Sequence, residues 1–220
     1  GGSEMGVQIN SKDFVAYLKK TALHISDSKE YISALDAATG DGDHWINMNM
    51  GFQALTAKAD KLETLPLSDC FKEIGMTFMS VVGGSSGVLY GGAYLAAAKT
   101  MGGQATADMR KLCEILTAMA EDMIRRGKSQ PGYKTMIDAI YPAAAAFRTG
   151  LENGSDERTL LSAVKQAALD GAESTKEMEA ARGRASYQKN KGVGHLDPGA
   201  VTMAYQIADL CDYVRESCTE

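Results

Sequence analysis

The sequence predicts an all-α protein, arranged as an antiparallel bundle of about eight helices. Apolar residues recur at intervals of three and four through most of the chain, which is the spacing of one helix face. The segments concerned are rich in Ala, Leu, Met, Lys and Glu, which have high helix propensity. Glycines cluster between these segments, and only four prolines occur in 220 residues. We therefore expect function to lie in the loops that join the helices.

The predicted helices follow one another along the chain. The first has its apolar face over residues 14–25. Residues 77–82 are the best strand candidate, but they continue a helical pattern that starts at Phe71. The last helix begins at Asp197-Pro198, because aspartate is a favoured N-cap and proline suits the first helical position. The other helices are expected over 46–62, 68–80, 88–101, 106–126, 134–150 and 157–180.

Composition bounds the class of protein. A chain of 220 residues forms one domain, 1–220, that buries enough surface to fold without a metal or disulfide. Residues 1–4 are interpreted as a cloning remnant and are set aside. The net charge of −5 and an aromatic content of 7% argue against nucleic-acid and anionic-membrane binding. No run of 18 apolar residues and no signal peptide is present, which excludes a transmembrane helix.

The cysteines indicate a reducing compartment. None of the four forms a C-x-x-C pair, and each lies in a segment with a helical pattern. We expect reduced thiols and a cytoplasmic protein. The cysteines are Cys70, Cys113, Cys211 and Cys218.

An acidic cluster is the sharpest local signal. Asp36, Asp41 and Asp43 fall within eight residues, around a glycine-rich turn. Hard oxygen ligands this close repel one another unless a cation lies among them, so the cluster is suited to two Mg²⁺ bridged by a polyphosphate. His44 and Asn47 follow at positions from which they can donate to phosphate oxygens. The alternative is a cluster of Asx turns and helix caps.

A glycine-serine turn spans residues 83–87 and contains Ser85 and Ser86. Glycines let backbone N–H groups approach a phosphate, and the helix that follows presents its positive end. The turn also matches G-x-S-x-G, which would make Ser85 the nucleophile of a hydrolase, but that motif needs a strand before it and a parallel sheet. Close helix packing is a further alternative.

Two later loops connect helices. Residues 126–136 are expected to form an ordinary connection, with contact to a ligand as the alternative. Lys134 and Thr135 are expected in the first turn of the next helix. Residues 182–195 have four cations and no acid, and they lead into the helix start at Asp197. A long basic loop that ends at a helix N-terminus is typical of anion binding, and the alternative is a solvated charged loop.

Four motifs occur in order over residues 36–199. They are Asp36-x4-Asp41-Gly-Asp43-His44-x-x-Asn47-Met48, Gly83-Gly84-Ser85-Ser86-Gly87-x-Leu89-Tyr90-Gly91, Gly132-x-Lys134-Thr135-Met136-x-Asp138, and Gly183-Arg184-Ala185-Ser186-Tyr187 with Gly194-His195-x-Asp197-Pro198-Gly199. Together they resemble the nucleotide-binding L subunit (DhaL) of dihydroxyacetone kinases of the phosphotransferase-system-dependent type.

The resemblance implies an antiparallel eight-helix barrel that holds Mg-ADP or Mg-ATP in the loops at one end. It implies that Asp36, Asp41 and Asp43 hold two Mg²⁺ and act in catalysis together with Arg184. Met136 would pack on the adenine. The residues expected around the nucleotide are His44, Asn47, Ser85, Ser86, Gly127, Met136, Arg184, Asp197, Pro198 and Gly199.

The resemblance also implies partners and a reaction. A separate K subunit would hold the triose, dihydroxyacetone or a similar short ketose, and a multiphosphoryl M subunit would rephosphorylate the ADP from phosphoenolpyruvate. The activity would be that of a glycerone kinase subunit in glycerol metabolism. A non-catalytic alternative is a nucleotide-state sensor that binds a transcription regulator.

The sequence departs from the family pattern at two places near the expected nucleotide site. Trp45 follows His44 where the family usually has glycine, and Gln188-Lys189-Asn190 replaces the more usual Gly-Glu-Arg. A bulky indole would narrow the phosphate site or pack against a partner. The changed loop would alter lid behaviour or partner choice.

Overall fold

The computed structural model describes residues 6–40 and 42–219, so Asp41 and residues 1–4 of the sequence predictions lie outside the described residues. The prediction of an all-α protein is confirmed, because the described residues form helices and one isolated bridge between Ile9 and Ala107. The α-helices are α1 (Ser11–Asp27), α2 (Lys29–Thr39), α3 (His44–Ala57), α4 (Ala59–Glu63), α5 (Leu67–Val81), α6 (Gly84–Met101), α7 (Met109–Gly127), α8 (Ile137–Glu152), α9 (Glu157–Ser174) and α10 (Pro198–Ser217). Two 3₁₀ turns are η1 (Thr175–Glu177) and η2 (Arg184–Tyr187).

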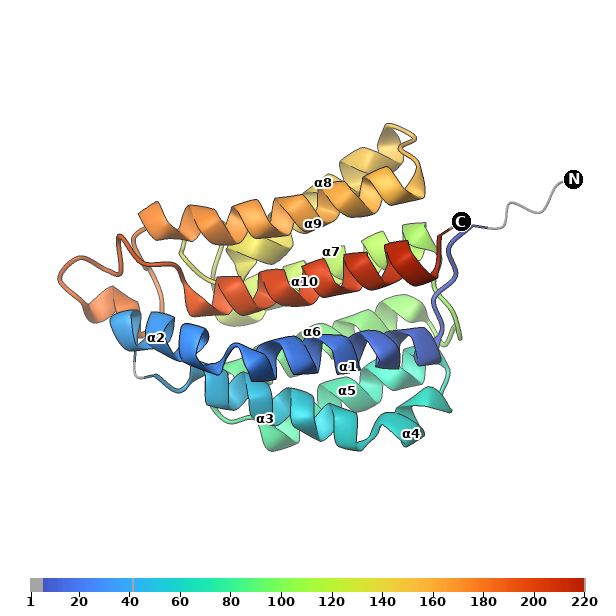
Figure 1. Cartoon of the computed structure of the whole chain (residues 1–220), viewed down its shortest axis with the longest axis horizontal. Coiled ribbons are helices and arrows are strands. Elements are labelled where there is room, and N and C mark those ends of the chain that lie inside the picture. Colours follow the sequence, from blue (N-terminus) through green and yellow to red (C-terminus); the bar gives the residue numbers. More distant parts are fainter. Residues whose placement is uncertain (1–5, 41, 220) are drawn as a thin grey trace, which may run out of the picture.

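The eight long helices form a closed ring. Each of α5 to α9 contacts the next helix along the chain, α10 contacts α1, α1 contacts α3, and α3 contacts α5. The long helices run along one common direction (Figure 1). The core between them contains aromatic pairs such as Phe14 and Phe71, whose ring centroids lie 4.8 Å apart in an edge arrangement. The ring therefore has two ends, and the loops at each end come together from distant parts of the sequence.

Local sequence explains where four of the helices begin, α1, α7, α9 and α10, because a side chain caps each of them. The Asp197 carboxylate accepts a hydrogen bond from Ala200 N at 2.8 Å and caps α10, with Pro198 at the first position as predicted. Asp108 caps α7 in the same way, through Lys111 N at 2.7 Å. These side chains satisfy backbone N–H groups that have no partner within the helix.

The number of helices differs from the prediction. About eight were expected, and the described residues contain ten, because the segment 46–62 is divided at Lys58 into α3 and α4. The other additional helix, α2, precedes the acidic cluster, where helix-forming residues were noted without an assigned range. The best strand candidate, residues 77–82, is wrong, because 77–81 belong to α5 and Val82 is its C-cap.

Packing of α8 against α9 depends on a glycine. A Cβ on Gly171 would lie 2.0 Å from the backbone oxygen of Asp138. This distance is far below van der Waals contact, so the two helices approach too closely for any larger residue. The start of α8 is thereby held against the end of α9, at the same end of the ring as α2.

The described part of the chain has neither a membrane-spanning helix nor a disulfide. No helix in the described part of the chain combines the length and apolar character that a bilayer crossing needs. All four cysteines are unpaired, as expected, and Cys70, Cys113 and Cys211 are buried.

Candidate functional site

One end of the ring is hollowed into a cavity of about 900 Å³. The end of α2, the starts of α3, α6 and α10, the end of α7 and the loops before α8 and α10 surround it. Every predicted site residue that the structure describes lines this cavity. They are Asp36, Asp43, His44, Asn47, Ser85, Ser86, Gly127, Met136, Arg184, Asp197, Pro198 and Gly199.

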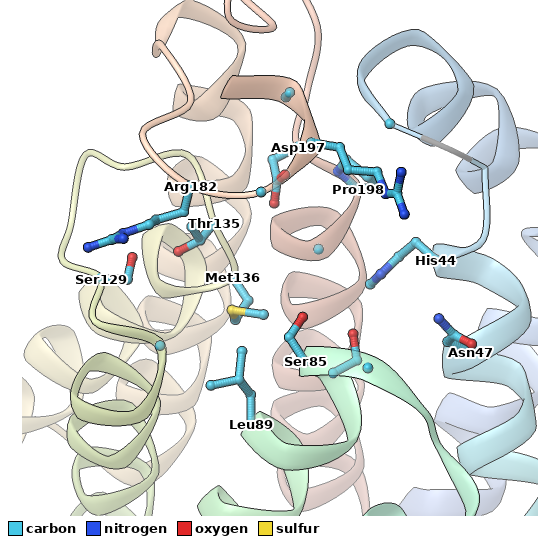
Figure 2. A pocket seen from close by; sticks show the side chains of 18 of the residues that line it. His44, Asn47, Ser85, Leu89, Ser129, Thr135, Met136, Arg182, Asp197 and Pro198 are labelled. Atoms are coloured by element: carbon cyan, nitrogen blue, oxygen red, sulfur yellow. The ribbon is translucent and has the colours of Figure 1, made fainter. Parts of the chain in front are cut away.

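The side chains approach the cavity from opposite walls. Figure 2 shows His44 and Asn47 on one side, Arg182 and Ser129 on the other, and Ser85 and Met136 between them. The cavity therefore has a polar wall formed by α2 and α3 and a second wall formed by the loop before α8.

The corner between α2 and α3 is fixed by Asp36. Its Oδ2 accepts a hydrogen bond from His44 N at 2.9 Å, and its side chain is buried. The His44 ring is held by a contact of 2.8 Å between Nε2 and Thr202 Oγ1 on α10. Burial lowers the pKa of His44, although the Asp36 carboxylate opposes this shift, so the imidazole is neutral at pH 7. The ring is thus oriented by two helices distant in sequence.

The structure describes two of the three predicted magnesium ligands, Asp36 and Asp43. Asp36 and Asp43 both line the cavity, and Asp36 Oδ1 lies beside Gly40 at the start of the acidic turn. Among the residues that the structure describes, no three His, Cys, Asp or Glu side chains form a metal-binding group; Asp41, the third predicted ligand, is outside them. The carboxylates that are described suit a hard cation such as Mg²⁺.

The start of α6 provides backbone donors. Gly83 is its N-cap and no side chain caps the helix, which leaves its first N–H groups available to a ligand. A Cβ on Gly87 would lie 2.0 Å from the oxygen of Val82, so α6 begins in tight contact with the end of α5. The hydrolase alternative is wrong, because Ser85 follows a helix rather than the strand that a nucleophile elbow requires.

The start of α10 brings the carboxyl group of Asp197 into the cavity. Burial raises the pKa of Asp197 to about 7, although the Ala200 N–H and the Lys134 ammonium both oppose this shift. A Cβ on Gly199 would lie 3.9 Å from both His44 Cε1 and Met136 N. Gly199 therefore occupies the point where α3, α10 and the loop before α8 meet.

The loop before α8 corrects one prediction. Lys134 and Thr135 were expected in the first helical turn, but α8 begins at Ile137 and Lys134 has a φ of +62°. The reason is Asp138, whose carboxylate accepts hydrogen bonds from Gly132 N at 2.7 Å and Thr135 N at 2.9 Å. These two bonds fold the preceding residues into a turn instead of a helix.

Several cavity residues were missed by sequence reasoning. The Ser129 hydroxyl is buried and has no hydrogen-bond partner among the described residues, and Arg126 is held by Asp122 through Nε at 2.7 Å. Both lie in the connection 126–136, and no local pattern distinguishes them. The cavity residues that were not among the predicted sites include Thr39, Val88, Leu89, Arg126, Ser129, Lys134, Thr135 and Arg182.

Trp45 and Gln188, which depart from the family pattern, both make hydrogen bonds to the backbone of other helices. Trp45 Nε1 donates to Ile25 O at 2.7 Å, and Lys29 Nζ lies 5.1 Å from the indole centroid. The indole therefore packs at the junction of α1, α2 and α3 and is absent from the cavity lining. Gln188 Nε2 donates to Ala38 O at 3.1 Å, which ties the basic loop to α2.

Comparison with known proteins agrees with this geometry. The model of the DAK2 domain family matches residues 38–212. The chain is 41% identical over 180 residues to the ADP-binding subunit DhaL of PEP-dependent dihydroxyacetone kinase 1 from Listeria innocua, covering 82% of this chain and 85% of that protein. It is 32% identical over 210 residues to the ADP-binding subunit DhaL of the Escherichia coli PEP-dependent dihydroxyacetone kinase, covering 96% of this chain and 100% of that protein.

A solved structure has the same fold. The dihydroxyacetone kinase of C. freundii, in complex with AMP-PNP and Mg²⁺, superimposes with a TM-score of 0.70 at 26% identity. The match covers 99% of this chain but only 36% of the kinase chain. Family model, relatives and fold agree, and the chain therefore belongs to the DAK2 domain family, among the DhaL subunits of dihydroxyacetone kinases.

Proposed function

We propose that this chain is the nucleotide-binding subunit of a phosphoenolpyruvate-dependent dihydroxyacetone kinase and that its cavity holds Mg-bound ADP or ATP. The observation that supports this most strongly is that every predicted site residue that the structure describes, from Asp36 to Gly199, lines one cavity of about 900 Å³. Such a volume is within the range of small-molecule sites. Its oxygen-rich corner at Asp36 and its apolar wall at Met136 match the two ends of a nucleotide.

The chain's own residues would position and neutralise the phosphates. Backbone N–H groups at the start of α6 would bind phosphate oxygens, and Arg184 would add a guanidinium. Asp36, Asp41 and Asp43 would hold two Mg²⁺, which supply charge neutralisation when bound. The neutral His44 imidazole, oriented by Thr202, would contact the phosphates without adding charge. Such transfer depends mainly on positioning and charge, so no general base on this chain is required.

The acceptor would be held by another subunit. The relatives in Listeria and Escherichia coli are described as subunits, and this chain spans about a third of the C. freundii kinase. We infer that a K subunit presents dihydroxyacetone, or a similar short ketose, at the cavity end of the ring. A phosphoryl-carrying M subunit, linked to phosphoenolpyruvate, would restore ATP from retained ADP, and these reactions would take place in the cytoplasm.

Native mass spectrometry of the purified chain, without added nucleotide, tests the proposal. We expect a mass increment for ADP with two magnesium ions, or binding after Mg-ATP is added. Asp36→Asn keeps an acceptor for His44 N but removes a charged ligand, so it should retain less nucleotide. Asp69→Asn, an exposed change in the first turn of α5, is the control. A wild-type chain that binds neither ADP nor ATP with magnesium would refute the proposed function.

A further inference from the structure

A buried lysine forms part of the cavity wall. Lys134 is 2% exposed, although its backbone is in the left-handed region with a φ of +62°. Lys128 and Lys191 share this backbone conformation in the described residues, but both are exposed. A buried ammonium group costs free energy unless hydrogen bonds compensate it, and a left-handed backbone adds to that cost. Specific contacts must therefore hold Lys134 in place.

Those contacts reach two segments far along the chain. Lys134 Nζ donates hydrogen bonds to the backbone oxygens of Thr175 and His195. Thr175 lies directly after α9, and His195 lies two residues before Asp197, the N-cap of α10. The Asp197 carboxylate and that of Asp138 also favour the charged ammonium, although burial is the larger effect and lowers the pKa of Lys134.

Thr175 attaches the segment before α10 at a second point. Its hydroxyl accepts a hydrogen bond from Asp197 N at 3.0 Å and donates one to Ala172 O at 2.6 Å. The residue is fully buried. Residues 195–197 are therefore fixed at His195 by Lys134 and at Asp197 by Thr175. Since Asp197 lines the cavity and caps α10, these two attachments set where α10 begins relative to the cavity.

The basic loop depends on the same lysine. Gly192 packs on the lysine stem, because a Cβ there would lie 3.0 Å from Lys134 Cε. The start of the loop is attached through Ala181 N to Tyr133 O at 3.3 Å, next to Lys134 in sequence. Lys134 thus supports the returning half of the loop that brings Arg184 to the cavity. Among these contacts, the charged one is made by the Lys134 ammonium group.

We propose that Lys134 is a positioning residue that holds the basic loop and Asp197 at the phosphate end of the cavity and thereby slows nucleotide release. The proposal rests on the proposed function. Lys134 acts through the 191–197 segment rather than by contact with the reacting atoms. Removal of its ammonium should therefore change how long a nucleotide stays more than how fast it enters.

The test compares two lysines with the same backbone strain. Lys134→Met removes the ammonium and keeps the stem, while Lys128→Met makes the same change at an exposed lysine with a φ of +48°. Stopped-flow with a fluorescent ADP and Mg²⁺ should show dissociation from Lys134→Met faster by about tenfold or more, with association changed by less than about threefold. Lys128→Met should behave as wild type, and Lys134→Arg, which keeps the cation and its donors, should recover part of the retention.

Hydrogen exchange of the nucleotide-free chain separates this proposal from the proposed function. Amides in 188–197 should exchange faster in Lys134→Met than in Lys128→Met. If no variant binds nucleotide but this difference appears, the proposed function fails and the structural hold stands. Equal exchange and equal dissociation in the two methionine variants would overturn the inference. If Lys134→Met does not fold, Thr175→Val replaces it, because it removes the other contact on the segment; unchanged exchange and dissociation there would overturn the inference as well.

Discussion

Replacement of Asp138 should unfold the turn that forms one wall of the cavity. The Asp138 side chain is 5% exposed and accepts backbone hydrogen bonds from Gly132 and Thr135. Asp138→Ala would remove both acceptors and leave two N–H groups without partners. Asp138→Asn would keep one acceptor oxygen and place an NH₂ group against the other N–H. Asp138→Ala should therefore destabilise the turn more than Asp138→Asn does.

The structure sets the size of this effect. A net hydrogen bond to a charged group contributes about 1.5–3 kcal/mol, so two such bonds contribute about 3–6 kcal/mol. The carboxylate also lies in the first turn of α8, where the helix dipole adds about 0.5 kcal/mol. We expect Asp138→Ala to lose about 4 kcal/mol of unfolding free energy and Asp138→Asn about 2 kcal/mol. For a chain of this length, 4 kcal/mol lowers the melting temperature by about 8–16 °C.

Urea denaturation followed by circular dichroism measures these losses, and ADP titration measures the effect on the cavity. Both affinity and stability should fall, because Thr135 and Met136 lie in or directly after the turn. Asp156→Ala is the matched control, since Asp156 caps α9 through Thr159 N at 2.9 Å outside the cavity and should leave affinity unchanged. An Asp138→Ala chain with wild-type denaturation and wild-type affinity would show that the turn does not depend on this carboxylate.

Three further predictions concern single groups. The raised pKa of Asp197 means that the folded chain holds this proton more tightly than the unfolded chain, so the stabilisation is lost as pH rises through about 7. The nucleotide-free chain should lose about 1 kcal/mol, or about 2–4 °C in melting temperature, between pH 6 and pH 8. Asp197→Asn should lack that part of the pH dependence, and an identical profile would contradict the assignment. Gly171→Ala should cost about 3 kcal/mol in urea denaturation, because its Cβ would lie 2.0 Å from Asp138 O; Gly127→Ala, with its nearest contact at 3.5 Å, should cost nothing, and equal losses would refute this reasoning. Trp45→Phe should lose about 1 kcal/mol through the missing bond to Ile25 O, and an unchanged urea midpoint would show that the indole N–H contributes little.

Sequence reasoning was most accurate where the physical cause is local. The N-cap and first position of α10 were predicted from Asp197 and Pro198 alone, and the side chain of Asp197 makes the expected bond to Ala200 N. It was least accurate where a contact overrides local propensity. Lys134 and Thr135 have acceptable helix propensities, but the carboxylate of Asp138 binds the preceding amides and delays the helix.

The candidate site shows the same division. Local motifs and the family resemblance predicted Asp36, Ser85 and Arg184 as site residues, and all three line the cavity. Ser129 and Arg126 carry no motif of their own, because they reach the cavity only through the way α7 ends beside the neighbouring loops. A residue of this kind is recognised by its surroundings, which a single sequence does not contain.

The sequence by itself determined the all-α class, most helix positions and the family likeness, because helical periodicity, caps and motifs depend on residues close together in the chain. Only the tertiary structure decided that segments from Asp36 to Gly199 meet in one cavity, that Trp45 packs away from it, and that Lys134 lies beneath the basic loop. These features depend on how the ring of helices closes. Closure is set by packing between helices distant in sequence, and a local pattern does not encode which distant surfaces meet.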